Sequence, residues 1–219
     1  MKLNLLFVLV TVFAQAQTYK FDYFLKYVQS NSGTKTENTL QFFVNSEDNR
    51  TNLLIVRSEK ETLAILNFLD ENVIHNFKLT DTTFPIKSAS FVYIDSEKLS
   101  GKSTDNRRFF KSEVLEENQN EVILKIKEYK TNQYKKVNTE AMVEMIPYDK
   151  HLSNFMLSYL FDYREINDKF KFDKNYIMKS GERKFRHPSY GKVTSKIKLV
   201  NFEKQSTEIV LDNSIIKYK

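Results

Sequence analysis

The chain has 219 residues, carries 34 Lys and Arg against 28 Asp and Glu, and contains no cysteine. A chain without cysteine can form no disulfide and no thiolate metal site, and it cannot be a lipoprotein acylated on cysteine. No apolar run after the first sixteen residues is long enough for a transmembrane helix. These features exclude disulfide-stapled and membrane-spanning classes of protein.

The first sixteen residues, MKLNLLFVLVTVFAQA, have the plan of a secretory signal peptide. Lys2 supplies the positive end, residues 3–13 are mostly apolar, and the triplet AQA matches a small-x-small cleavage site. The apolar part is too short to cross a bilayer. We expect cleavage after Ala16 and an exported, soluble protein, periplasmic or extracellular, formed by a single β-rich domain over residues 17–219.

Apolar and polar residues alternate with period two along most of this domain, which predicts strands with one buried and one exposed face. Such runs lie at residues 19–27, 40–44, 73–79, 122–127, 137–145, 197–199 and 209–211. The glycines between apolar runs, at 33, 101, 181 and 191, are expected in turns. We predict about ten to twelve strands in a large curved antiparallel sheet or half-barrel, with barrel and sandwich closure both open.

One segment departs from this alternation with period 3.6, which predicts an amphipathic helix over residues 151–163, with Asp149 as a capping residue. Residues 53–56 and 63–66 are apolar on both faces, so these two strands must be covered on both sides. We expect the helix to pack on the concave face of the sheet and to cover them. A helix that binds a membrane surface or a partner is the alternative, disfavoured because Lys and Arg are sparse on its polar face.

Residues 100–104, SGKST, resemble the end of a phosphate-binding loop. The full motif needs a glycine where this chain has Ser96, and it needs a helix directly after the loop. The residues that follow, TDNRRFFKSEV, instead resemble a turn into a strand. We predict no nucleotide cofactor and assign Gly101 to a turn.

Catalytic and metal-binding patterns are absent from the sequence. The three histidines, His75, His151 and His187, lack metal-ligand spacing, and His75 is expected on an inward strand face as a hydrogen-bonded core residue. There is no Gly-x-Ser-x-Gly nucleophile elbow. We assign no catalytic residue, no metal and no cofactor, and we keep open a hydrolase site assembled from distant residues.

The segment GERKFRHPSYGK, residues 181–192, is expected to be a basic loop between two glycines. Its candidates for binding phosphate or carboxylate groups are Arg183, Lys184, Arg186, His187 and Lys192. Lipid head groups, an acidic polysaccharide or a partner protein would supply such groups, and the exported location argues against nucleic acid. A solvated loop anchored by its two aromatic residues is the structural alternative.

Aromatic residues are abundant, with 18 Phe and 12 Tyr. A half-barrel could use some of them to line an apolar cavity for a lipid-like ligand. The candidates are Phe21, Tyr23, Phe42, Phe77, Phe155 and Tyr159. Dense core packing would use the same residues, and both interpretations stay open.

The signal peptide, the domain of about two hundred residues, the strands and the concave-face helix together resemble the lipoprotein-carrier (LolA/LolB-like) half-barrel proteins of the bacterial envelope. The stretch FAQAQTYKFDYFLKY also resembles small secreted bacterial proteins of unassigned function. The resemblance lies in the layout and implies a half-barrel fold and an envelope location, and it transfers no functional residue.

These observations favour a non-catalytic binding protein that holds an apolar or amphipathic ligand, or an envelope component. The expected partners are a lipid or another envelope protein, with no nucleic acid and no cofactor. A structural or adhesive envelope protein that acts through protein contacts is one alternative, and a hydrolase is the other. Ligand identity and oligomeric state stay open.

Overall fold

The structure, a computed structural model, describes residues 16–48, 50–58, 61–68, 73–83, 86–98, 108–163, 166, 169–170, 172–212 and 216. The predicted signal peptide lies outside these residues except for Ala16, which begins the first strand. The stretch SGKST and its predicted turn at Gly101 also lie outside them.

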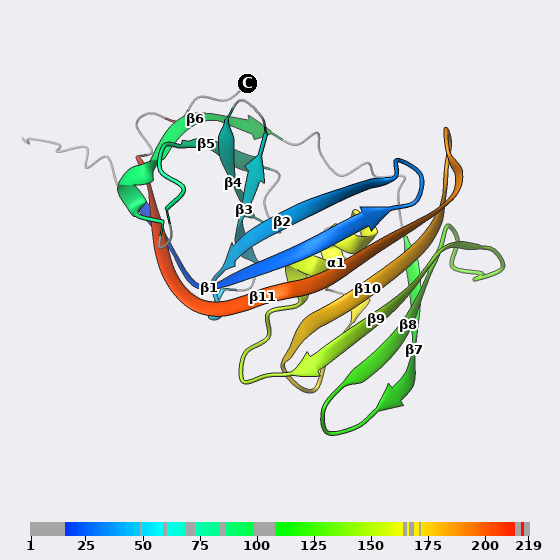
Figure 1. The fold of residues 1–219 in the computed structure, drawn as a ribbon. Coiled ribbons are helices and arrows are strands. Elements are labelled where there is room, and N and C mark those ends of the chain that lie inside the picture. Colours follow the sequence, from blue (N-terminus) through cyan, green and yellow to red (C-terminus); the bar gives the residue numbers. More distant parts are fainter. Residues whose placement is uncertain are drawn as a thin grey trace, which may run out of the picture.

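The strands form one antiparallel sheet with the order β6-β5-β4-β3-β2-β1-β11-β10-β9-β8-β7 (Figure 1). This arrangement confirms the predicted mainly-β fold, a large curved antiparallel sheet with one main helix. The strands are β1 (Ala16–Asn31), β2 (Thr36–Val44), β3 (Thr51–Arg57), β4 (Thr62–Phe68), β5 (Val73–Leu79), β6 (Phe91–Lys98), β7 (Phe109–Glu117), β8 (Val122–Tyr129), β9 (Val137–Pro147), β10 (Tyr176–His187) and β11 (Gly191–Asp212).

Among the described residues there is one α-helix, α1 (Asn154–Phe161), which lies within the curve of the sheet, and a short 3-10 helix, η1 (Ser88–Ser90), precedes β6 (Figure 1). The helix is shorter than the predicted 151–163. Its N-cap position is Ser153, whose hydroxyl donates to the Tyr176 carbonyl at 2.8 Å, so Asp149 is not the cap. Asp162 adopts a left-handed conformation with φ of 51° and ends the helix. Within the described part of the chain, no helix is long and apolar enough to span a membrane.

The central pair of strands, β1 and β11, is much longer than its neighbours. Residues 16–31 of β1 pair with β11, but only residues 23–31 also pair with β2. The remainder, residues 16–22 of β1 with residues 205–212 of β11, forms a two-stranded extension that we call the terminal ribbon. The last two alternation runs of the sequence therefore belong to one continuous strand.

Irregular pairing lets the side chains of β1 and β11 pack on both faces of the sheet. The register between β1 and β11 shifts at Phe21/Tyr23 and again at Lys26/Tyr27, with the extra residue in β11 each time. An extra residue bends a strand and changes the face to which its side chains point. The terminal ribbon consequently packs over β3–β5, and the Thr207 hydroxyl donates to the Ile86 carbonyl at 2.8 Å.

Two apolar cores result, one on each face. We call the first the helix-side core, where Tyr27, Phe42 and the residues of α1 pack together. The second, the ribbon-side core, contains Phe43 and Leu53 together with the ribbon residues. Adjacent residues such as Phe42 and Phe43 thus belong to different cores, because successive side chains of a strand point to opposite faces.

The helix is not the main cover of the strands at residues 53–56 and 63–66, contrary to the expectation from the sequence. Leu53 and Ile55 pack into the ribbon-side core, as do Ala64 and Leu66. Only Leu54 contacts the helix-side core, and it is partly buried there. The main cover of these strands is the terminal ribbon, a contact between distant parts of the chain.

A chain of polar groups is buried in the ribbon-side core. The His75 Nδ1 atom lies 2.6 Å from the Ser96 hydroxyl, which lies 2.8 Å from the Tyr93 hydroxyl. The Phe68 ring packs edge-on against the imidazole, with the ring centres 5.6 Å apart. Burial lowers the pKa of His75 below its ordinary value because the charged imidazolium loses its hydration. His75 is thus the hydrogen-bonded core residue that the alternation predicted.

Acidification should therefore destabilise the fold before most carboxylates titrate. The folded-state pKa of His75 lies below its unfolded value of about 6.5, so the unfolded state binds the proton first as the pH falls. Burial also lowers the pKa of His151, which acts in the same direction. We expect the free energy of unfolding from urea titrations to decrease between about pH 7.5 and about pH 5. The His75→Gln variant should show a smaller decrease, and equal slopes for both proteins would contradict the assignment.

Candidate functional site

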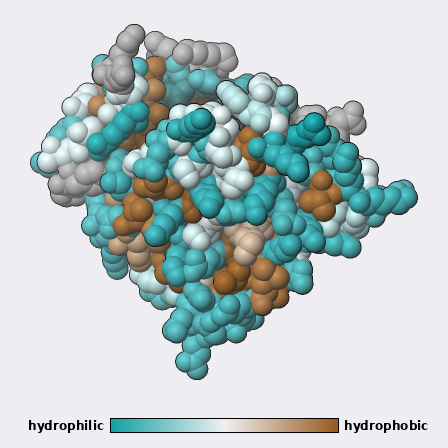
Figure 2. Space-filling model, turned by 45° about the vertical axis from the view of Figure 1, so that its right-hand side comes forward, coloured by the Kyte–Doolittle hydropathy of each residue, from teal (hydrophilic) through white to brown (hydrophobic). Residues whose placement is uncertain are grey.

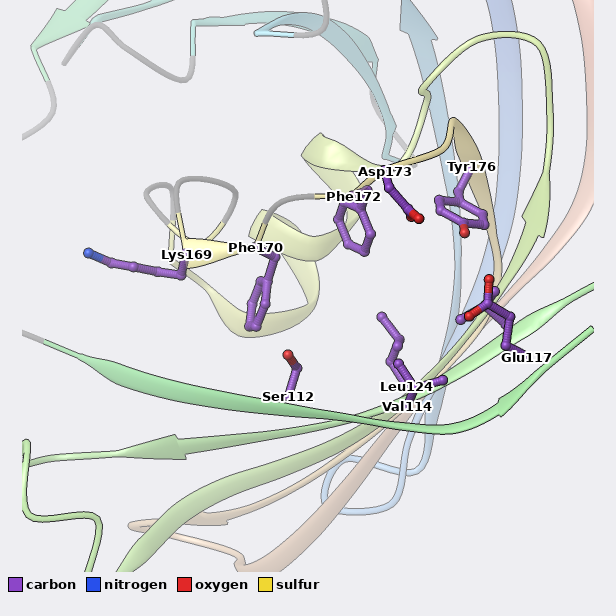
Figure 3. A pocket seen from close by; sticks show the side chains of 10 residues that line it. Ser112, Val114, Glu117, Leu124, Lys169, Phe170, Phe172, Asp173 and Tyr176 are labelled. Atoms are coloured by element: carbon purple, nitrogen blue, oxygen red, sulfur yellow. The ribbon is translucent and has the colours of Figure 1, made fainter.

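A cleft opens on the concave side between the edge strand β7, its neighbour β8 and the segment that leads into β10 (Figure 3). Its volume is about 210 Å³. Val114 of β7 and Leu124 of β8 form one wall, and the rings of Phe170 and Phe172 project towards them from the opposite side. The full set of lining residues is Ser112, Val114, Glu117, Val122, Leu124, Lys169, Phe170, Phe172, Asp173 and Tyr176.

The cleft lies beside the helix-side core, next to the edge of the sheet. Val122 and Leu124 are buried members of the helix-side core, as is Tyr176. Val114, on the edge strand, is 56% exposed. An apolar surface therefore continues from the core to the solvent, with Phe170 and Phe172 as a partial cover.

Charged groups surround the mouth of the cleft. Glu117 forms an ion pair with Lys174, with Nζ and Oε1 3.0 Å apart, and this contact raises the pKa of Lys174. Lys169 has no ion-pair partner among the described residues. The Tyr176 hydroxyl likewise has no hydrogen-bond partner within the described ranges, and burial raises the pKa of its phenol. An apolar floor with a polar rim suits an amphipathic molecule.

The size of the cleft limits what it can enclose. Ligand pockets for drug-sized molecules usually hold about 300–1,000 Å³. The volume of this cleft, about 210 Å³, is below that range. The cleft can bury an aromatic ring or a short alkyl chain, and it cannot bury a complete long acyl chain.

The six aromatic residues proposed from the sequence as a cavity lining lie elsewhere. Tyr23, Phe42 and Phe155 are in the helix-side core, where the rings of Phe42 and Phe155 are 4.7 Å apart. Phe21 and Phe77 are in the ribbon-side core on the other face. Tyr159 is half-exposed, and its hydroxyl donates to Gln29 at 3.2 Å. None of the six is among the residues that line the described cleft.

The segment 181–192 is not a loop, as the sequence suggested, but the tip of a β-hairpin. Residues 181–187 continue β10, and β11 begins at Gly191, which has φ of 71° and suits the tight turn. Gly181 lies inside the strand because α1 passes directly above it. A Cβ atom at this position would come within 3.0 Å of the Leu160 side chain.

Arg183, one of the predicted anion-binding residues, binds a backbone carbonyl of the helix α1. Its Nη1 atom donates to the Leu160 carbonyl at 2.9 Å, and its guanidinium stacks over the Phe185 ring at 4.5 Å. Burial lowers the pKa of the guanidinium, and the Glu128 carboxylate opposes that effect. Arg183 thus caps the C-terminal carbonyls of α1, where a positive charge is favourable.

Arg108, at the start of β7, binds the same end of the helix. Its Nη1 atom donates to the Phe161 carbonyl at 3.0 Å and lies 3.7 Å from Glu128 Oε1. Glu128 is only 3% exposed and also accepts a hydrogen bond from Asn138 at 3.1 Å. We call Arg108 and Arg183 the arginine pair. This pair anchors α1 to two distant strands of the sheet.

The other candidates for anion binding differ in their surroundings. Lys184 pairs with Glu182 on the same strand at 3.0 Å, and Glu182 also contacts Lys196 at 3.2 Å. Arg186 and Lys192 are exposed beside the turn. The imidazole of His187 stacks on Tyr190 with ring centres 4.8 Å apart. The structure therefore keeps these last three residues together at the turn and separates them from Arg183 and Lys184.

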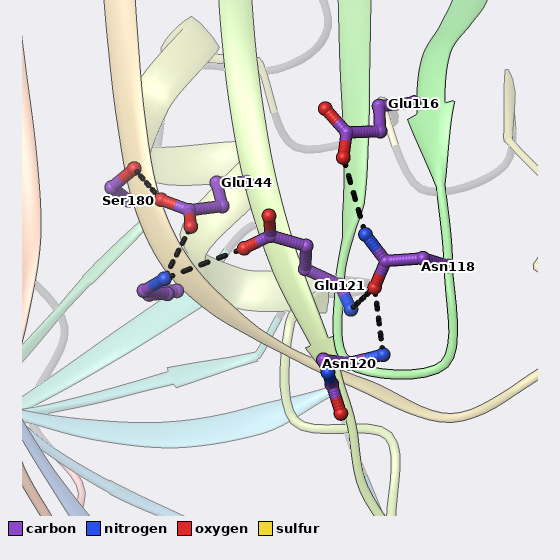
Figure 4. A network of polar contacts seen from close by, with 7 residues as sticks. Glu116, Asn118, Asn120, Glu121, Glu144 and Ser180 are labelled. Atoms are coloured by element: carbon purple, nitrogen blue, oxygen red, sulfur yellow. Dashed lines mark hydrogen bonds and ion pairs between the residues drawn. The ribbon is translucent and has the colours of Figure 1, made fainter.

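The outer face of the sheet carries a polar network around Lys179 (Figure 4). The Lys179 ammonium contacts Glu144 and lies 3.5 Å from Glu121 Oε2. Ser180 donates to Glu144 at 2.9 Å, and the Asn118 side chain accepts two backbone N–H groups of the β7–β8 turn. These contacts tie β8, β9 and β10 together. In the part of the chain that the structure describes, no cluster of His, Asp and Glu could hold a metal ion.

The nearest approach to a hydrolase site is the buried pair of Ser96 and His75. A serine and a histidine at hydrogen-bond distance match the first part of a nucleophile and its base. Ser96 is 0% exposed, and Phe68 covers the imidazole. A substrate cannot reach this hydroxyl in the folded protein, so the pair is structural.

The residues of the cleft were not identified from the sequence. They come from β7, β8 and the segment 169–176, which are separated in the chain. Phe170 and Phe172 alternate with polar residues in a stretch that resembles a short strand in sequence. The one available signal was Val114 and Leu115 in a strand that is otherwise strongly charged.

Comparisons with known proteins add little to this description of the site. The fold is similar to that of a LolA superfamily protein from Nitrosomonas europaea, with 8% identity, a TM-score of 0.31, and coverage of 84% of this chain and 86% of that chain. No family model and no curated protein matches the sequence. At these values the likeness agrees with the layout noted in the sequence and carries no argument about the site.

The arginine pair predicts unequal effects of two substitutions in the same strand. Arg183→Ala removes a charged hydrogen bond to α1 and leaves Glu128 with one cation fewer, so we expect a loss of about 1.5–3 kcal/mol in the free energy of unfolding. Arg186→Ala, at an exposed position three residues later, should change it by less than about 0.5 kcal/mol. Urea titrations that give equal losses for the two variants would refute the capping role.

Proposed function

We propose that the protein binds the short apolar part of an amphipathic molecule in the cleft between β7–β8 and the segment 169–176. The observation that carries this proposal is the open apolar floor of Val114, Leu124 and Phe172 under a charged rim. Elsewhere the apolar residues of the concave face are packed against α1. The layout shared with half-barrel envelope proteins supports a carrier or receptor role outside the cytoplasm.

The ligand would enter with its apolar end towards Leu124 and its polar end at the rim. Lys169 is exposed beside the mouth, and its side chain extends away from the rings of Phe170 and Phe172 (Figure 3), so an anionic head group would meet this cation outside the cleft. The Tyr176 hydroxyl supplies a hydrogen-bond donor beside the floor. No step of this account needs a catalytic group or a cofactor, and the function proposed is binding alone.

The affinity for straight-chain carboxylates should depend on chain length in a characteristic way. Each methylene buried in the cleft contributes about 0.8 kcal/mol, or about a fourfold gain in affinity. The gain should stop at a chain much shorter than that of hexadecanoate, because the cleft is smaller than the usual pocket for a drug-sized molecule. Titration calorimetry with a series of alkanoates measures this dependence. An affinity that rises steadily to hexadecanoate would contradict a cleft of this size.

A matched pair of substitutions locates the binding. Val114→Trp fills the cleft from the edge strand and should weaken binding of the best alkanoate at least tenfold, whereas Met142→Trp places the same side chain on the outer face of β9. Both residues are exposed, and neither substitution changes the charge. If the two variants bind equally well, the ligand does not occupy this cleft.

A further inference from the structure

Three turns of the sheet meet at one end of the molecule. They are the β1–β2 turn at residues 31–36, the β8–β9 loop at residues 130–136 and the β10–β11 turn at residues 187–191. The pairing of Phe185 with Thr139 and of Asn31 with Ser195 places the ends of these strands level with one another. In Figure 1 the three turns lie at the right-hand side, away from the terminal ribbon.

Two of these turns, β1–β2 and β10–β11, are held to each other by direct contacts. The Ser32 amide donates to the Thr194 carbonyl at 3.0 Å, and the Thr194 amide donates to the Ser32 hydroxyl at 2.9 Å. Gly33 lies against Tyr190, where an added Cβ atom would be 3.2 Å from the tyrosine Cβ. The turns therefore present their side chains from a fixed platform.

This end of the sheet is strongly cationic. Among residues 31–37, 130–137 and 186–192, Glu37 is the single carboxylate. The exposed cations of the three turns are Lys35, Lys130, Lys135, Lys136, Arg186 and Lys192. None of the six forms an ion pair with any residue that the structure describes. Some lysines elsewhere on the sheet do form one, as in the pair of Lys125 and Glu140 at 3.3 Å.

The opposite end of the same strands carries the negative charge. Its carboxylates include Glu47, Asp48, Glu116, Glu117 and Glu121. Lysines at that end are already bound, as in the pairs of Lys150 with Glu47 and Lys174 with Glu117. The molecule thus has a positive and a negative end, and such a charge separation orients a protein in front of a charged surface.

Two exposed tyrosines stand among the cations. Tyr190 is 53% exposed at the β10–β11 turn, and Tyr134 is 36% exposed in the β8–β9 loop. The Tyr134 ring is fixed by Tyr129, with ring centres 5.1 Å apart, and by the Lys111 ammonium at 4.1 Å. Tyrosine favours the interface between water and lipid, where its ring meets apolar groups and its hydroxyl stays hydrated.

We propose that this basic end, defined by the six cations and by Tyr134 and Tyr190, docks on the surface of an anionic lipid bilayer. A cluster of four to eight Lys and Arg is the size that binds anionic lipid through charge. Figure 2 turns the right-hand side of Figure 1 forward and shows a mostly hydrophilic surface with small separate apolar groups. Such a surface lacks the large apolar centre of a stable protein interface.

This docking goes beyond the proposed ligand binding and is independent of it. The cleft lies towards the acidic end, where Glu117 and Tyr176 line it. A bilayer at the basic end therefore leaves the cleft accessible. The Val114→Trp variant should bind vesicles as the parent protein does, so failure of one proposal leaves the other standing.

The test compares two variants with equal charge change. The docking variant carries Lys135→Glu, Lys136→Glu, Arg186→Glu and Lys192→Glu. The control variant carries Lys20→Glu, Lys78→Glu, Lys87→Glu and Lys204→Glu, four exposed lysines outside the basic end. Both are mixed with vesicles of phosphatidylcholine alone and of phosphatidylcholine with one-third phosphatidylglycerol, and bound protein is measured by sedimentation.

We expect the parent protein to bind only the anionic vesicles and to be released as the ionic strength rises from about 0.01 M to about 1 M. The docking variant should lose at least about 100-fold in partition coefficient, because each basic residue near the surface contributes substantially to the attraction. The control variant should lose less than about threefold. Equal losses in the two variants, or parent binding to neutral vesicles that salt does not change, would overturn the proposal.

Discussion

The structure depends on the long antiparallel pair of β1 and β11, whose side chains must be buried on both faces of one sheet. Leu25 and Tyr27 enter the helix-side core, while Phe21 and Phe24 enter the ribbon-side core. The register shifts in β11 make this possible, because an extra residue turns the strand and brings the terminal ribbon over β3–β5. Without that bend the apolar face of β3 and β4 would be open to water.

The other face is filled by α1, which is too short to be stable alone. It is held at its start by the bond from Ser153 to Tyr176 and at its end by the arginine pair. The cleft forms beside this core, between the wall of β7 and β8 and the segment 169–176, which follows the helix in the chain. The same strands end in charged turns, so the cleft and the basic end occupy different ends of one rigid sheet.

Local patterns in the sequence predicted the strands well and the contacts between distant segments poorly. The alternation at residues 137–145 predicted a strand with one buried face, and β9 includes all of these residues. The apolar stripe at 152–163 overestimated the helix, because Leu152 is buried without being helical. Gly181 suggested a turn, but its missing side chain makes room for Leu160 across the sheet. The role of Arg183 and the residues of the cleft arise only when separate segments meet in the fold.

The central claim is that α1 packs against the concave face and that a ligand binds in the small cleft at β7–β8, among the residues that the structure describes. The most direct test is mass spectrometry of an organic extract of the protein, purified without detergent, beside an extract of the Val114→Trp variant. The account predicts one small amphipathic compound, near one per protein molecule, that is lost from the variant. A long-chain phospholipid in the parent extract, an empty extract, or the same compound retained by the variant would contradict it.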